Sequence, residues 1–197
     1  MKHYFQYAKD RNITTLFFIF LASYLFLNVG HHPFSIPSIV KLSGGFSILN
    51  VIPYYNAETA YVYLNAYNET AIAIYNRILI FDFLVLIPVY VSFFSLSLFF
   101  LLERLTDLKN SIVQKIALLP FIAGFLNMVE DIIIALLLYT LPEKWNFLAE
   151  ICGILTSSKS LITVICMLAI FGLYIVLGIK KVQKKRANSY HKAGPTN

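Results

Sequence analysis

Charged residues are scarce in this sequence. Asp, Glu, Lys and Arg make up 13% of its 197 residues, about half the usual share of a soluble domain, whereas 58% of the residues are hydrophobic. With a mean hydropathy of +0.70, the chain is not expected to fold as a water-soluble globule. The composition predicts an all-α, polytopic membrane protein, and the length accommodates one compact domain of this kind.

Cysteines and catalytic motifs are also few. The two cysteines, Cys152 and Cys166, would lie about 21 Å apart on one helix, too far for a disulfide bond. The sequence has no phosphate-binding loop, dinucleotide fingerprint, serine elbow, HExxH or CxxC motif. His31 and His32 are adjacent, and no other Cys or His stands at ligand spacing from them. We therefore expect no metal and no cofactor, and assign no catalytic residue.

Four long apolar segments are present instead. They cover about residues 13–29, 71–102, 112–141 and 147–179, and each can cross a hydrocarbon layer of roughly 30 Å. The first segment is longer than the core of a cleaved signal peptide, and no small-x-small cleavage site follows it, so we expect it to be retained. Pro120 is expected to bend the third segment. The pattern predicts a four-helix transmembrane bundle over residues 13–179.

Residues 30–70 are expected to form a cap on the outer face of the bundle. Prolines and the Gly44-Gly45 pair interrupt this stretch, and its scattered apolar residues are typical of a membrane surface. A short helix is predicted over residues 56–66, with Asn56 at its amino end and Asn68 in a left-handed conformation after its carboxyl end. The cap is rich in tyrosine, which suits the headgroup layer, and is the candidate docking surface for a protein partner.

The distribution of positive charge predicts the orientation in the membrane. Twelve of the sixteen Lys and Arg residues lie in the basic head (residues 1–12), in the turn between the second and third spans, and in the basic tail (residues 180–197). We expect the protein to lie in the cell membrane. The positive-inside rule then predicts that both termini are in the cytoplasm. The tail is expected to attract anionic lipid headgroups rather than nucleic acid.

Polar residues interrupt the third apolar segment. Asn127, Glu130 and Asp131 stand at positions i, i+3 and i+4, so a helix presents all three on one face. A charge near the centre of a bilayer costs about 3 kcal/mol or more, and these side chains should therefore face partners inside the bundle.

The fourth segment offers the partner, Lys159. Around it, residues recur at spacings of 4, 3, 4 and 3, the pattern of a helix that packs against neighbours: Cys152, Thr156, Lys159, Thr163 and Cys166. At 1.5 Å per residue, Asp82, Glu130 and Lys159 lie about 10, 16 and 18 Å below the outer ends of their spans. We predict one buried layer that contains Asp82, Asn127, Glu130, Asp131 and Lys159.

The charges of this layer do not balance, since three carboxyl groups face one ammonium. Arg77 is the nearest further cation, and with Thr156 and Thr163 it is expected to support the cluster. Such a cluster can hold a proton, a cation or a small polar ligand. Two alternatives stay open: a lipid-modifying enzyme with Glu130 and Asp82 as acid and base, and a structural protein whose charges are fully paired.

Two stretches also form a recognisable pattern: Ala57-Glu58…Leu64…Tyr67…Tyr75…Asp82…Pro88-Val89-Tyr90, and Leu119-Pro120…Asn127-Met128-Val129-Glu130-Asp131. The pattern, over about residues 55–165, resembles uncharacterised bacterial four-span membrane proteins. Those have an Asp before a Pro-x-Tyr in the second span, a D-x-x-E-N motif in the third and a Lys in the fourth. Here Asn127 and Asp131 stand where that motif has Asp and Asn. The resemblance implies the fold and no activity.

Overall fold

A computed structural model describes residues 2–106 and 109–192. All of its elements are helical, and no strand occurs in the described part of the chain, as the all-α prediction requires. Four segments are long and apolar enough to cross a membrane: Asp10–Asn28, Glu69–Leu105, Asn110–Tyr139 and Asn146–Gln183. Each of them overlaps one of the four predicted spans.

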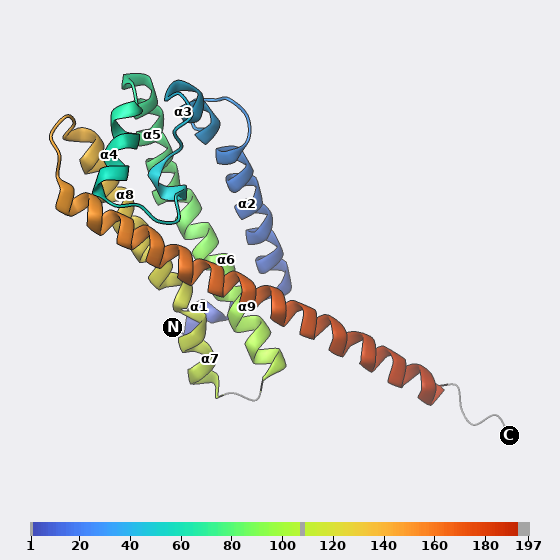
Figure 1. The fold of residues 1–197 in the computed structure, drawn as a ribbon. Coiled ribbons are helices and arrows are strands. Elements are labelled where there is room, and N and C mark those ends of the chain that lie inside the picture. Colours follow the sequence, from blue (N-terminus) through green and yellow to red (C-terminus); the bar gives the residue numbers. More distant parts are fainter. Residues whose placement is uncertain (1, 107–108, 193–197) are drawn as a thin grey trace.

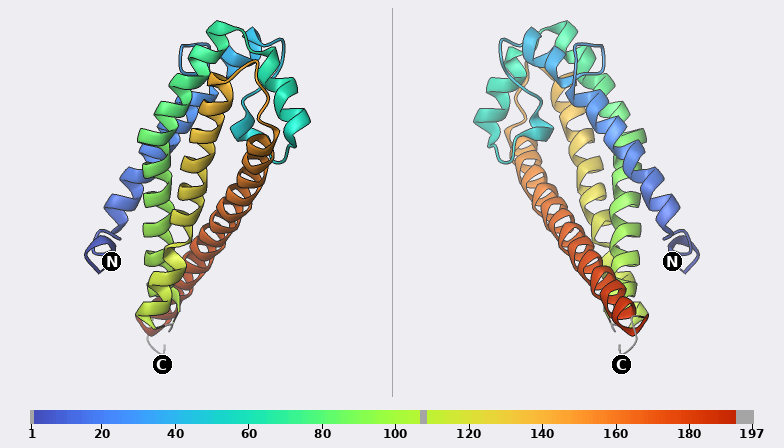
Figure 2. Two further views of the ribbon diagram at one scale, coloured as in Figure 1. Left: turned by 90° about the vertical axis from the view of Figure 1, so that its left-hand side faces the viewer. Right: turned by 90° about the vertical axis from the view of Figure 1, so that its right-hand side faces the viewer.

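The four segments run between two ends of the molecule (Figures 1 and 2). At one end lie the short helix α1 (Lys2–Phe5) and helix α7 (Asn110–Ala117); the residues between the first two long segments form a cap at the other end. Helix α2 (Asp10–Asn28) packs on α6 (Ile87–Leu105), and α8 (Leu119–Tyr139) packs along α9 (Asn146–Lys192). The basic head and the α6–α7 turn, which the distribution of Lys and Arg predicts on one side, lie at the same end of the molecule (Figure 1).

A wide turn interrupts the second segment. Helix α5 (Glu69–Phe81) continues through a π-helical turn, η2 (Asp82–Leu86), into α6. Pro88 has no backbone N–H and cannot bond to the carbonyl four residues before it, and the N–H of Ile87 reaches five residues back to the carbonyl of Asp82. The turn places Asp82 where the helix widens.

The third segment is broken rather than bent. Helix α7 ends at Ala117, and α8 begins at Leu119 with Pro120 in its first turn, where a missing N–H costs no helical hydrogen bond. Helix α9, in contrast, does not end near residue 179. It continues through the predicted basic tail to Lys192, and at 1.5 Å per residue it is about 70 Å long. Its carboxyl end extends beyond the other helices (Figure 1).

The cap contains α3 (Ile36–Leu42), the short 3-10 helix η1 (Leu49–Val51) and α4 (Ala57–Ala66). Asn56 caps α4 as predicted, since its side chain accepts a hydrogen bond of 2.9 Å from the N–H of Thr59. The left-handed conformation expected at Asn68 is wrong. Asn68 has φ −78° and instead caps α5, because its side chain accepts a hydrogen bond of 2.9 Å from the N–H of Ala71.

The cap is held closely against α9. The hydroxyl of Ser157 donates 3.0 Å to the carbonyl of Pro53, and Glu150 accepts 2.9 Å from the N–H of Ala57. A methyl group at Gly153 would lie 2.0 Å from the carbonyl oxygen of Tyr55, so only glycine allows this approach. Residues 53–57 are thus fixed to α9, whereas η1 contacts α8.

Buried apolar side chains form two clusters. One joins the cap to α5 and to the end of α8 beside it. The other joins α6 to α1, α2, α7 and the middle of α9, and it is rich in phenylalanine. The π turn η2 lies between the two clusters along the second segment, and Asp82 is its first residue.

Candidate functional site

Lys159 joins α9 to the polar face of α8. Its Nζ lies 2.5 Å from Oε2 of Glu130 and donates a hydrogen bond to Oδ1 of Asn127. Asn127 and Glu130 are three positions apart, so their side chains lie on the same face of α8, one turn from each other. A single ammonium group can therefore reach both. Glu130 is fully buried and Lys159 is 9% exposed. The ammonium and the carboxylate thus form a buried ion pair, as the sequence predicts.

The second oxygen of Glu130 is bound by the seam on α9. The hydroxyl of Thr156 donates 2.7 Å to Oε1, and it lies 3.3 Å from the phenol oxygen of Tyr55 in the cap. Burial raises the pKa of Tyr55, so the phenol stays protonated. Oε1 of Glu130 therefore has a hydrogen-bond partner and Oε2 an ion-pair partner, and the sequence did not indicate the contribution of Tyr55.

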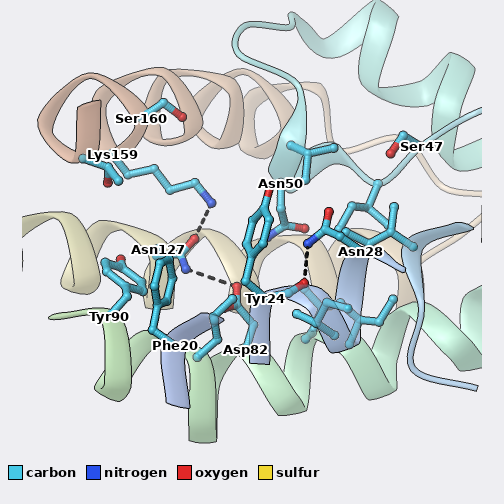
Figure 3. Close-up of a pocket in the computed structure, with 18 of the residues that line it drawn as sticks. Phe20, Tyr24, Asn28, Ser47, Asn50, Asp82, Tyr90, Asn127, Lys159 and Ser160 are labelled. Atoms are coloured by element: carbon cyan, nitrogen blue, oxygen red, sulfur yellow. Dashed lines mark hydrogen bonds between the residues drawn. The ribbon is translucent and has the colours of Figure 1, made fainter. Parts of the chain in front are cut away.

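Asp82 lies on the other side of Asn127. Its Oδ2 accepts a hydrogen bond of 3.1 Å from Nδ2 of Asn127, so one carboxamide connects Lys159 with Asp82 (Figure 3). Asp82 is 8% exposed, and its Oδ1 has no hydrogen-bond partner among the described residues. This side of the cluster is buried but incompletely bonded.

Asp131 belongs to a separate branch. Its Oδ1 accepts 2.7 Å from the side chain of Asn50, whose own Oδ1 accepts 2.7 Å from the hydroxyl of Tyr75. The N–H of Leu49 donates 2.9 Å to the same hydroxyl. The cap thus enters the polar layer through η1. Oδ2 of Asp131 has no partner in the described part of the chain, and the residue is among those that line a cavity of about 430 Å³ between α5, η2 and α8.

The predicted supporting residues are not all brought together. Thr156 bonds Glu130, and Thr163 lines the cavity next to Lys159. Arg77 is exposed on α5 and makes no ion pair within the described residues. The reason is helical phase, because five residues separate Arg77 from Asp82, and they face directions about 140° apart.

A cavity of about 480 Å³ lies between α2 and α9, and Asp82, Asn127 and Lys159 form its polar floor (Figure 3). Its walls are mostly apolar and come from α2, α6 and the cap, with Phe20, Tyr90 and Ile48 among them. Glu130 does not line it. Of these two buried acids, Asp82 therefore borders the cavity and Glu130 does not.

The floor of the cavity offers both a hydrogen-bond acceptor and a donor. An ammonium has three N–H groups, and Lys159 uses them for Glu130 and Asn127, which leaves one free. Oδ1 of Asp82 is the free acceptor. No group of three or more His, Cys, Asp or Glu side chains suited to a metal ion occurs in the described residues. The arrangement can bind a proton, a cation or a small polar group.

Comparisons with protein-family models, curated proteins and solved structures found no match to this chain. The resemblance to bacterial four-span proteins therefore stays an expectation, and the function has to be argued from the geometry of the site.

Proposed function

We propose that the chain is an integral membrane protein, a four-helix transmembrane bundle with its cap outside and both termini in the cytoplasm. The four long apolar segments support this proposal. Helix α9 also has a large exposed apolar surface, which is unusual for a helix surrounded by water. Its exposed large apolar side chains include Leu161, Val164, Met167, Leu168, Phe171 and Ile175. The basic head and the α6–α7 turn lie at the end opposite the cap, in keeping with the positive-inside rule.

Within this bundle, we propose that the cavity between α2 and α9 binds a small polar group through Asp82, Asn127 and Lys159. The observation that carries this proposal is the free Oδ1 of Asp82, on a carboxyl group that is more than nine-tenths buried at the floor of a cavity. A buried polar atom without a partner costs about 1–3 kcal/mol, and more when charged. A ligand that brings a hydrogen-bond donor removes this cost.

The two alternatives fit the geometry less well. A purely structural network would pair all of its charges, yet Asp82 and Asp131 each keep one oxygen without a partner among the described residues. An enzyme with Glu130 as its acid would need that group beside a substrate. Both oxygens of Glu130 are instead engaged by Lys159 and Thr156, away from the cavity.

The proposal is tested by carbodiimide labelling of the protein in lipid nanodiscs, with butylammonium as the competing probe. A hydrophobic carbodiimide modifies accessible protonated carboxyl groups, which peptide mass spectrometry locates. We expect labels on Asp82 and Asp131 and none on Glu130. Butylammonium should slow the labelling of Asp82 at least fivefold, because its N–H groups bind the free oxygen.

Asp131 is the matched control in the same molecule, since it adjoins the other cavity. Its labelling should not respond to butylammonium, and Asp82→Asn should abolish the protected label alone. Labelling of Glu130 at the rate of Asp82, or equal protection of both aspartates, would contradict a binding site between α2 and α9.

A further inference from the structure

A second cavity lies next to the first between α2 and α9. It has a volume of about 560 Å³, and Phe20 and Phe94 line both cavities. Its other walls are apolar or aromatic apart from Thr14, and include Phe17, Phe93 and Ile170. No charged residue lines it. A polar-floored cavity and an apolar groove therefore lie next to each other and have two phenylalanines in common.

The two spaces follow one another along α9. Lys159 lines the first cavity and Tyr174 the second, and these residues are about 22 Å apart along the helix. That distance is most of the roughly 30 Å thickness of a hydrocarbon core. A compact polar ligand would occupy only the polar end. A molecule with one polar head and one hydrocarbon chain would occupy both parts.

The charges on the floor indicate the chemistry of the head. Asp82 presents a free oxygen, while Lys159 is already paired with Glu130. The Lys159 ammonium still has one N–H to donate, but its charge is offset by Glu130, so the ionised Asp82 gives the floor a net negative charge. A carboxylate head would meet a like charge there, whereas an ammonium head would form a charge-assisted hydrogen bond.

We propose that the ligand of this site is a single-chain amphiphile with an amine-bearing head. The ammonium binds Asp82, and the hydrocarbon chain lies in the groove between α2 and α9. This assignment rests on the proposed function, because it extends the Asp82 cavity. The polar head makes binding selective for this ligand over the surrounding lipid. The groove alone contributes little binding free energy, because the ligand's hydrocarbon chain only replaces a lipid chain.

The test compares hexadecylammonium with butylammonium as protectants of Asp82 against the carbodiimide in nanodiscs. Met167→Trp places a large side chain at the groove, and Leu168→Trp is the matched control, because Leu168 is exposed one position away and does not line the groove. We expect protection by hexadecylammonium to fall at least tenfold in Met167→Trp and to stay unchanged in Leu168→Trp. Protection by butylammonium should be the same in both variants. Partition of the amine into the bilayer is common to all samples and cancels.

Thr14→Trp approaches the groove from α2 and should reproduce the effect if Met167→Trp fails to fold. Equal protection by hexadecylammonium in the wild type and in the folded groove variant would overturn the placement of the chain and leave the proposed function intact. Protection by palmitate as strong as by hexadecylammonium would overturn the amine head. If neither amine protects Asp82, the proposed function fails as well.

Discussion

Glu130 and Asp82 are two acids that share one polar cluster and are both buried, but their surroundings differ. Glu130 is enclosed between α8 and α9, where Lys159 and Thr156 engage its two oxygens. Asp82 lies at the π turn and lines a cavity; Asn127 engages one of its oxygens, and the other has no partner among the described residues. The number of partners, rather than the degree of burial, separates a group that holds helices together from one that can bind a ligand.

The largest effect is expected at the closed side, in Lys159→Met. The substitution keeps an apolar stem of similar length and leaves Glu130 buried without its counter-charge. We expect a loss of about 3 kcal/mol or more in the free energy of unfolding, measured by titration with denaturing detergent in mixed micelles. The double variant Lys159→Met/Glu130→Gln should recover part of this loss, since no charge then stays buried alone. A loss below about 1 kcal/mol would remove the distinction between the two acids.

An intermediate effect is expected at the cap, in Tyr75→Phe. The hydroxyl of Tyr75 donates to Asn50 and accepts from the N–H of Leu49, and its removal leaves both groups without this partner. We expect a loss of about 1–3 kcal/mol and faster hydrogen exchange at the Leu49 amide, measured by mass spectrometry. The control is Tyr54→Phe, since Tyr54 is 70% exposed. Unchanged exchange in Tyr75→Phe would show that η1 is held by other contacts.

The smallest effect on stability is expected at the open side, in Asp82→Asn. The amide keeps the shape of the side chain and an oxygen that can accept from Asn127, and it removes a charge with one free oxygen. We expect the free energy of unfolding to change by less than about 1 kcal/mol in the same detergent titration. A loss as large as that of Lys159→Met would place Asp82 within the structural pair and contradict its role in binding.

The contact between Lys159, Glu130 and Asn127 could be predicted because two simple constraints act together. Helical periodicity places Asn127 and Glu130 on one face, and the cost of charge in a bilayer turns that face toward another helix. The small and polar seam on α9 then identifies the only matching partner. Neither step needs knowledge of the loops.

The contribution of the cap could not be predicted in the same way. Asn50 reaches Asp131 because η1 folds toward α8, and this path depends on tertiary contacts such as the one at Gly153. A single polar residue within the apolar run from Ile48 to Ile52 was the available signal. Asn68 shows a related ambiguity, because asparagine is favoured at both ends of helices and here lies between two of them.

The π turn at Asp82 also changes what a single long segment can do. One extra residue in a turn rotates everything after it by about 100° relative to an uninterrupted α-helix. The buried apolar side chains of α5, up to Leu79, belong to one apolar cluster, and those of α6, from Ile87 onward, belong to the other. Deleting one residue here would rotate the side chains of α6 relative to the helices that pack on it. We therefore expect this position to tolerate a change of side chain better than a change of length.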